Sequence, residues 1–245
     1  MIKFFRQFRQ RMIKENRVSK YLLYAIGEIV LVVIGILIAL SINNSSAEAK
    51  ARNKELVLLR EMRQNLQADM LDNVGNISGN LRRIRANEMV LKALQNRTAL
   101  NDTLKPELGN IWGNYQLSEN IAAWENLKSV GIDLISNDSL RNAIAALYST
   151  KYAYLDNLEK DLDNVYQWNH MYPMVLKHLN VEAMWVSATP VDHEAMLNDR
   201  EFQEVLKNNL FIRGYMQGQY EMIQQEIQSI VEQIDDHIRG LEERQ

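Results

Sequence analysis

One acidic side chain, Glu28, lies inside an otherwise apolar stretch of the sequence. The 22 residues from Tyr21 to Ile42 contain no other charged residue. As a helix they reach about 33 Å, enough to cross a hydrocarbon core of about 30 Å. A carboxyl group inside a membrane is costly and is by default a functional candidate. Its chemistry would be proton or ion handling, or a hydrogen bond that specifies helix assembly. We favour the second, because proton coupling needs partner polar groups and this sequence offers a single span.

Small residues accompany Glu28 on one side of that helix. A 4-3-4-3 spacing places on one face Glu28, Val32, Gly35, Ala39 and Ile42. The pair Gly35-x-x-x-Ala39 lets a second helix approach closely, and Gly27 adds another small side chain next to the acid. The sequence therefore predicts a transmembrane helix over residues 21–42. Its expected partners are the lipid bilayer and either a second copy of the chain or other membrane protein subunits.

Other residues that could do chemistry form no recognisable catalytic or metal-binding motif. The four histidines, His170, His178, His193 and His237, show no spacing of three or four residues, and the chain has no cysteine. A thiol nucleophile and Cys-ligated metals are thereby excluded, and we expect no metal and no cofactor. His237 falls at a heptad core position, which favours a polar layer. We do not expect an enzyme, because phosphate-loop, dinucleotide and Gly-x-Ser-x-Gly motifs are also absent from the sequence.

A carboxylate pair and a group of aromatic residues remain as candidates outside the apolar stretch. Glu159 and Asp163 are four residues apart, but a di-metal bundle needs more acidic and histidine ligands, so we expect them on a solvated face. Trp124, Tyr148 and Tyr152 could form a ligand or partner surface, or they could fill the core. Of these two interpretations we favour the core.

Charge is distributed unevenly about the apolar stretch. Residues 1–20 carry seven Lys or Arg against one Glu, whereas the other 225 residues have a formal charge of −9. The positive-inside rule then predicts a cytoplasmic N-terminus and residues 43–245 on the opposite side. A cleaved signal peptide, with Ala47-Glu48-Ala49 as its site, is the alternative, and we favour an uncleaved anchor because the apolar run is long.

The basic N-terminus has a helical pattern of its own. Ile2, Phe5, Phe8 and Met12 recur at helical spacing, which predicts an amphipathic helix on an anionic membrane surface over residues 1–20. An unstructured tail is the alternative. Nucleic-acid binding is not expected, because the basic segment is short and lies next to the apolar stretch.

The rest of the chain is expected to be an antiparallel helical bundle, making the protein all-α. Only ten glycines and three prolines occur in 245 residues, so few breaks interrupt the helical patterns. The expected helices cover about 47–95, a Ser118-capped stretch to about 130, an Asp138-capped stretch ending near Pro173, and an Asp199-capped stretch over about 200–241. Gly75 and Gly79 indicate a kink or a close crossing. We expect no strands. Heptad spacing in the last helix would also suit an intermolecular coiled coil.

Three stretches of the sequence resemble a known family. The opening MIKFFR, the stretch YAIGEIVLVVIGILIAL over residues 24–40, and WENLKSVG over 124–131 resemble a family of small single-pass membrane proteins of unknown function from Bacteroidetes. The resemblance implies a bacterial inner membrane and a periplasmic bundle at 43–245, and its signature includes Gly27, Glu28 and Gly35. It implies no activity. We therefore expect a non-enzymatic scaffold or accessory subunit of an envelope complex. A periplasmic ligand sensor, or an ion-coupling subunit using Glu28, is the alternative.

Overall fold

The computed structural model describes residues 18–99 and 102–243 of the chain. The described chain is mostly helical, with one long apolar N-terminal helix and a helical body, which confirms the predicted fold class. It divides into two units, residues 1–54 and residues 55–245. Residues 1–17, which hold most of the predicted basic amphipathic segment, lie outside the description.

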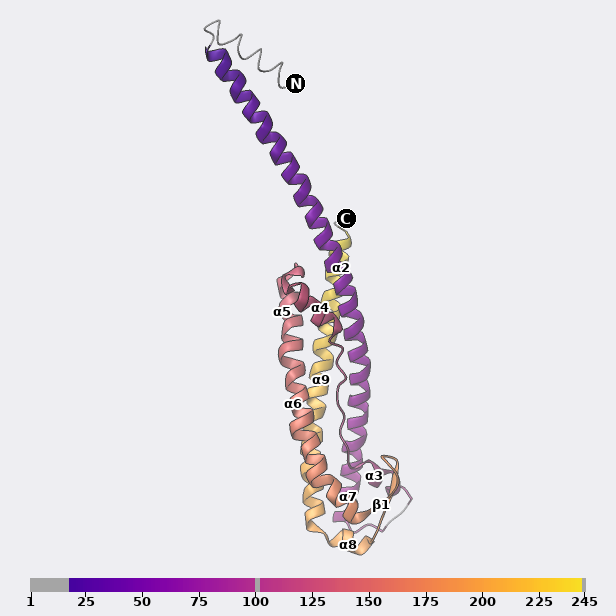
Figure 1. Cartoon of the computed structure of the whole chain (residues 1–245). Coiled ribbons are helices and arrows are strands. Elements are labelled where there is room, and N and C mark those ends of the chain that lie inside the picture. The colour runs from indigo at the N-terminus through magenta and orange to yellow at the C-terminus, as the bar shows by residue number, and fades with distance from the viewer. Residues whose placement is uncertain (1–17, 100–101, 244–245) are drawn as a thin grey trace. The chain divides into compact units, whose positions relative to one another are not determined.

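Figure 1 labels the helices α2 to α9 and the strand β1. In chain order the elements are α2 (Val18–Gln95), α3 (Leu104–Asn110), α4 (Ala122–Val130), η1 (Ile132–Leu134), α5 (Asp138–Ala146), η2 (Leu147–Lys151), α6 (Tyr152–Asn157), η3 (Leu158–Asn164), η4 (Gln167–Met171), α7 (Tyr172–His178), β1 (Leu179–Ala183), β2 (Ser187–Pro190), α8 (His193–Asn198) and α9 (Arg200–Glu242). The stretch from α5 to α7 has no break, so it forms one long helix, residues 138–178.

The first unit is the N-terminal part of α2. From Leu22 to Ile42 its large apolar side chains are exposed. Among the described residues, this helix is the one that is long and apolar enough to cross a membrane. A signal sequence near the N-terminus would have a similar length and composition. The apolar stretch, the linking residues 43–54 and the first bundle helix form one continuous α-helix, which ends at Gln95 as predicted.

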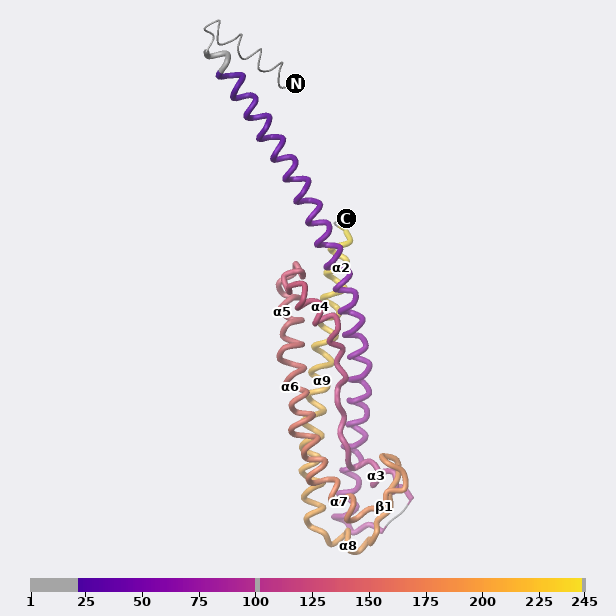
Figure 2. Tube along the Cα trace, viewed as in Figure 1, coloured from indigo at the N-terminus to yellow at the C-terminus, as the bar shows by residue number. Residues whose placement is uncertain are grey.

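The second unit is a bundle of three long helices. Helices α2 and α9 are antiparallel, because residues later in α2 contact residues earlier in α9. The contacts are Arg63–Asp235, Asn73–Tyr220 and Asn80–Arg213. The helix 138–178 runs antiparallel to α9 as well. Residues 113–121, which form neither helix nor strand, lie along α2 and fill the remaining side of the bundle (Figure 2).

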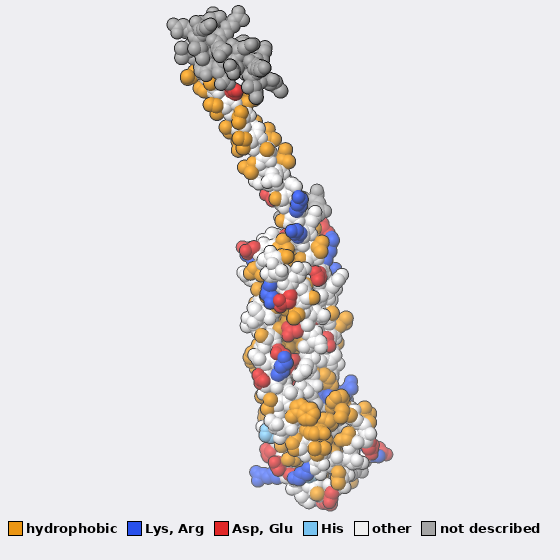
Figure 3. Space-filling view, in the orientation of Figure 1, with side chains coloured by type: hydrophobic (Ala, Val, Ile, Leu, Met, Phe, Trp, Pro, Cys, Tyr) orange, Lys and Arg blue, Asp and Glu red, His pale blue; other side chains and the backbone are white. Residues whose placement is uncertain are grey.

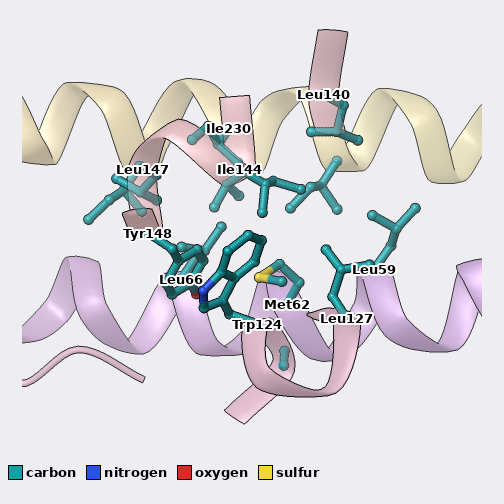
Figure 4. Close-up of a cluster of buried hydrophobic side chains, with 14 of the residues drawn as sticks. Leu59, Met62, Leu66, Trp124, Leu127, Leu140, Ile144, Leu147, Tyr148 and Ile230 are labelled. Atoms are coloured by element: carbon teal, nitrogen blue, oxygen red, sulfur yellow. The ribbon is translucent and has the colours of Figure 1, made fainter. Parts of the chain in front are cut away.

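Apolar side chains form two separate clusters in the bundle. The first apolar cluster joins α2, α4, the start of the helix 138–178 and the C-terminal half of α9 (Figure 4). The second apolar cluster joins the end of α2 with α3, α7, α8, the hairpin and the start of α9. Trp124, Tyr148 and Tyr152 belong to the first cluster, where the rings of Trp124 and Tyr148 stack with centroids 5.3 Å apart.

The helix 138–178 differs from its prediction because it contains π-helical turns. The segments η2, η3 and η4 are π-helical, and a π turn holds more residues than an α turn. Side chains four residues apart therefore stay on one face instead of drifting round the helix. The inward positions are Tyr148, Tyr152, Glu159, Asp163, Gln167, Met171 and Val175. A regular 3.6-residue period predicts Tyr154, Leu162 and Val165 on the inward face, and this prediction is wrong because all three are exposed.

Two helix ends also differ from their predicted positions. Pro173 does not end the long helix, because it stands in the first turn of α7, directly after the π turn η4. A proline at the start of an α-helical segment removes an N–H that has no regular acceptor there. Ser118 is not a cap: its backbone N–H donates to Asp72, and α4 begins later, at Ala122.

A short β-hairpin interrupts the helical body, contrary to the expectation of no strands. β1 and β2 pair antiparallel, with Leu179 opposite Pro190. Strands of five and four residues are too short to show a clear alternation in the sequence. Trp185, in the connecting turn, has a φ of +59°, which is an unfavourable backbone conformation for a bulky residue.

The N-cap of the helix 138–178 provides a stability test. The side chain of Asn137, not that of Asp138, accepts from the backbone N–H of Leu140 at 3.1 Å. Asn137→Ala should lower the free energy of unfolding by about 1 kcal/mol. Asp138→Ala, which removes an exposed ion pair with Arg141, should cost about 0.5 kcal/mol or less. Thermal and urea unfolding of the full chain in detergent would measure both, and equal losses would contradict this assignment.

Candidate functional site

A buried polar layer separates the two apolar clusters. On α2 its residues follow a 4-3-4-3-4 spacing and are Asp69, Asn73, Asn76, Asn80, Arg83 and Asn87. The facing residues on the other two helices are Glu159, Asp163, Gln167, Asn209, Arg213 and Gln217. Buried polar groups are costly unless they are hydrogen-bonded, so this layer needs a dense set of partners.

Three asparagines of α2, seven residues apart, bind backbone carbonyl groups on neighbouring segments. Asn73 donates to the carbonyl of Tyr220 at 2.8 Å, and Asn80 to that of Arg213 at 2.8 Å. Asn87 donates to the carbonyl of Ile111 at 2.9 Å. A helix shifted along its neighbour would lose such bonds, so this asparagine ladder fixes the register between α2 and α9.

A fully buried ion pair lies at the centre of the layer. Arg213 pairs with Asp163, and both side chains are 0% exposed. Arg213 also donates to the side-chain oxygen of Asn80 at 3.2 Å. Burial lowers the pKa of Arg213, the nearby Tyr220 opposes this shift, and the charge of Arg83 lowers the pKa further. The expectation that Glu159 and Asp163 lie on a solvated face is wrong, because the π turns direct both carboxylates into the bundle.

Side-chain acceptors of this layer bind the backbone of the irregular segment 113–121. The N–H of Leu117 donates to Glu159 at 3.0 Å, and the N–H of Asn120 donates to Asp69 at 2.9 Å. Burial raises the pKa of Glu159 to about 7, although the hydrogen bond from Leu117 opposes this shift. Burial likewise raises the pKa of Asp69. Both groups therefore serve as hydrogen-bond acceptors in surroundings that disfavour their charge.

Arg83 stands apart from the other charged groups of the layer. Its side chain is buried and donates to the carbonyl oxygen of Trp112. Its guanidinium carbon lies 4.8 Å from the ring centroid of Tyr115 and 5.9 Å from that of Trp185. Within residues 18–99 and 102–243, no carboxylate lies within ion-pair distance of Arg83, and its Nε has no hydrogen-bond acceptor. Burial lowers the pKa of Arg83.

Three glycines permit the close packing around Arg83. A Cβ atom on Gly79 would collide with the ring of Tyr115, and one on Gly109 would lie 2.5 Å from the backbone nitrogen of Ser187 in the hairpin. Gly113 has a φ of +96°, and a Cβ there would lie 2.9 Å from Nε1 of Trp185. These glycines thus allow the tyrosine, the hairpin and the Trp185 indole to reach Arg83.

An exposed group of apolar side chains covers this end of the bundle. We define the aromatic patch by four exposed side chains, Trp168, Met184, Trp185 and Val186, and the half-buried Tyr172. Ring contacts of 5.1 to 6.0 Å link Trp168 to Tyr172, Tyr172 to Trp112, and Trp112 to Trp185. Trp168 is 57% exposed and Trp185 is 48% exposed. Figure 3 shows hydrophobic side chains gathered where Figure 1 places α3 and the hairpin. Exposed apolar patches of this kind mark interaction sites.

The residues singled out from the sequence have different surroundings. Gly27, Glu28, Gly35 and Ala39 lie on the exposed apolar part of α2, and a Cβ on Gly27 or Gly35 would meet no atom within 4 Å. By contrast, Trp124, Tyr148 and Tyr152 are buried in the first apolar cluster, the interpretation that the sequence favoured. The proposed ligand or partner surface is therefore not formed by these three residues.

The predicted polar layer at His237 is also present. Its Nε2 lies 2.8 Å from Glu55, which also accepts from the backbone N–H of Ser136 at 2.7 Å. No group of three or more His, Asp or Glu within the described residues is placed to hold a metal ion.

Sequence reasoning missed Arg83 and its contact with Trp185. The heptad spacing of Asn73, Asn80 and Asn87 was a usable signal of a polar α2 face, and Arg83 falls on that face. For Trp185 the sequence offered no such signal, because its role depends on a hairpin that brings it back onto α2 from about 100 residues away.

Comparison with known proteins identifies a family and nothing further. A family model described as "Family of unknown function (DUF6090)" matches residues 28–177. The match begins at Glu28, within the apolar stretch, and ends at the last turn of α7. No curated protein and no solved structure matches the chain.

The two mid-helix glycines of α2 allow a matched comparison. Gly75→Ala should raise the free energy of unfolding by about 0.5–1 kcal/mol, because nothing lies within 4 Å of the new methyl group and alanine favours helix. Gly79→Ala should lower it by about 1–3 kcal/mol, because the methyl group displaces Tyr115. Chemical unfolding of both variants would measure this difference, and stabilisation by both would contradict the packing described around Arg83.

Glu159 should make stability depend on pH. Its pKa is about 7 in the folded chain against 4.5 for an unperturbed glutamate, so its favourable contribution is complete below pH 4.5 and is lost as pH rises through 7. Relative to Glu159→Gln, the wild type should lose on the order of 3 kcal/mol between pH 4.5 and pH 8. Thermal unfolding of both proteins across this range would measure the loss, and parallel profiles would exclude it.

Proposed function

The chain belongs to this family of unknown function, and from its own structure we propose that it is a non-enzymatic, single-pass membrane protein whose bundle serves as a scaffold or accessory subunit of an envelope complex. The observation that carries the proposal is the continuity of α2. One helix contains both the apolar stretch and the first long helix of the bundle, so a chain anchored by that stretch keeps its bundle covalently tethered to the membrane.

Two observations support an uncleaved anchor over a signal peptide. The family match includes residues 28–42 of this stretch, so most of it belongs to the region that the family shares. The Ala47-Glu48-Ala49 sequence lies within α2, whereas proteolytic sites concentrate in exposed loops and termini.

Orientation follows from the charge distribution. The seven Lys or Arg residues before the apolar stretch favour a cytoplasmic N-terminus, with residues 43–245 on the far side. Together with the resemblance to a Bacteroidetes family, this supports a bundle in the periplasm, anchored in a bacterial inner membrane.

The polar layer supports a structural role over catalysis. Asp163 and Arg213 bind each other, and Glu159 accepts from the backbone of Leu117. All three side chains are at most 2% exposed. Their hydrogen-bonding and charge interactions are used within the bundle, so they stabilise its architecture in place of acting on a substrate.

Assembly is proposed to use the α2 face that carries Glu28, Gly35 and Ala39. Small residues permit close helix approach in lipid, and a carboxyl group there can hydrogen-bond across the contact. The partner is a second copy of the chain or another membrane protein subunit.

Crosslinking in native membranes tests this assembly face. After solubilisation in mild detergent, Glu28→Ala and Gly35→Leu should each reduce the yield of crosslinked oligomer or co-purifying subunit several-fold, because they remove the polar contact and block close approach. Val30→Phe, on the opposite side of the helix at 100° per residue, adds bulk as a control and should keep the wild-type yield. Unchanged yields in Glu28→Ala and Gly35→Leu would reject the proposal.

A further inference from the structure

We propose that Arg83, together with Tyr115 and Trp185, is a docking site for a carboxylate side chain on a partner protein, flanked there by apolar residues that cover the aromatic patch. The inference rests on the proposed scaffold function, since it specifies one surface through which such a scaffold holds a partner. It concerns the bundle alone and is independent of the α2 face that contains Glu28.

The charge balance around Arg83 indicates an anion. Arg83 lies close enough to Arg213 for its charge to lower the pKa of Arg213, whose own charge is balanced by Asp163. Arg83 has no carboxylate partner in the described parts of the chain, although its side chain is only 4% exposed. A buried charge without a counter-charge is unfavourable. A carboxylate from outside would supply that counter-charge.

Donor groups without acceptors lie at the same place. Nε of Arg83 and Nε1 of Trp112 are both buried and have no acceptor among the described residues. Arg83 donates to the backbone carbonyl oxygen of Trp112, and the ring centroid of Trp112 lies 6.0 Å from that of Trp185, so both residues border one site. Unused N–H donors beside a cation suit an acceptor-only group, which is what an ionised carboxylate is.

Trp185 controls access to this site. Its indole lies over the guanidinium of Arg83 and beside Gly113, yet it is half exposed and stands in a turn with a positive φ. Strained residues of this kind occur where structure serves binding. A carboxylate reaches Arg83 when the Trp185 indole turns outward, which leaves the ring available to contact the incoming segment.

The surroundings of Arg83 specify what must flank the carboxylate. The aromatic patch presents Trp168, Met184, Trp185 and Val186 to solvent, and Trp, Met and Arg are the residues enriched at protein interfaces. A buried arginine beside exposed tryptophans has the composition of a binding hot spot. The complementary segment therefore carries one acidic side chain between apolar side chains.

Peptide binding to the full chain in non-ionic detergent tests the proposal, with tryptophan fluorescence as the readout. The probes are acetylated and amidated Gly-Leu-Glu-Leu-Gly and its Gly-Leu-Gln-Leu-Gly counterpart. The glutamate peptide should bind at least about tenfold more tightly than the glutamine peptide. Arg83→Gln should remove that difference, whereas Arg82→Gln, on an exposed neighbouring residue, should preserve it.

A second variant keeps the test valid if Arg83→Gln does not fold, as judged by circular dichroism. Trp185→Ala, at a half-exposed turn position, should weaken both peptides. Absence of saturable binding up to about 10 mM, equal binding of the two peptides, or unchanged discrimination in a folded Arg83→Gln variant would overturn the proposal. Binding of free N-acetylglutamate as tight as that of the peptide would assign the site to small acids and also overturn it. Because neither probe nor variant involves Glu28 or Gly35, this result is separate from the crosslinking result.

Discussion

The backbone of residues 113–121 belongs to no helix or sheet, so its N–H groups have no regular acceptors. Backbone donors require partners, and two of the long helices, α2 and the helix 138–178, provide them as side chains. Glu159, Asp69, Asp72 and Gln167 accept from successive parts of this segment. The backbone N–H groups of this irregular segment need hydrogen-bond acceptors. This need explains why carboxylates point into the bundle at positions where a simple helical bundle would have leucine.

The same requirement accounts for the unusual helix 138–178. Glu159, Asp163 and Gln167 are four residues apart and must all face inward, but a regular α-helix would rotate each of them about 40° from the last. The π turns η3 and η4 remove this drift. Once the layer is polar, the two apolar clusters on either side of it become separate. Register between the helices then depends on directional bonds such as those of Asn73 and Asn80.

The sequence predicted those parts of the fold that depend on local chemistry. Helix α2 ends at Gln95, and α9 begins after its Asp199 cap, as expected. The face of helix 138–178 could not be predicted, since a 3.6-residue period selects Leu162 and Val165, whereas the inward face is set by hydrogen bonds to a distant segment. The Arg83 site was also out of reach, because α2, the segment around Gly113 and the hairpin meet there only in three dimensions.

The spacing of buried residues has a consequence for how the helices can coil. Seven-residue spacing, as in the α2 asparagines, favours a left-handed supercoil, while a repeat longer than the 3.6-residue α-helical turn favours a right-handed one. A four-residue repeat built from regular α-helix would therefore oppose the handedness that α2 imposes. By widening turns inside the helix 138–178, the π segments absorb this conflict locally. The helix 138–178 and α2 can then contribute to one polar layer although their residue spacings favour supercoils of opposite hand.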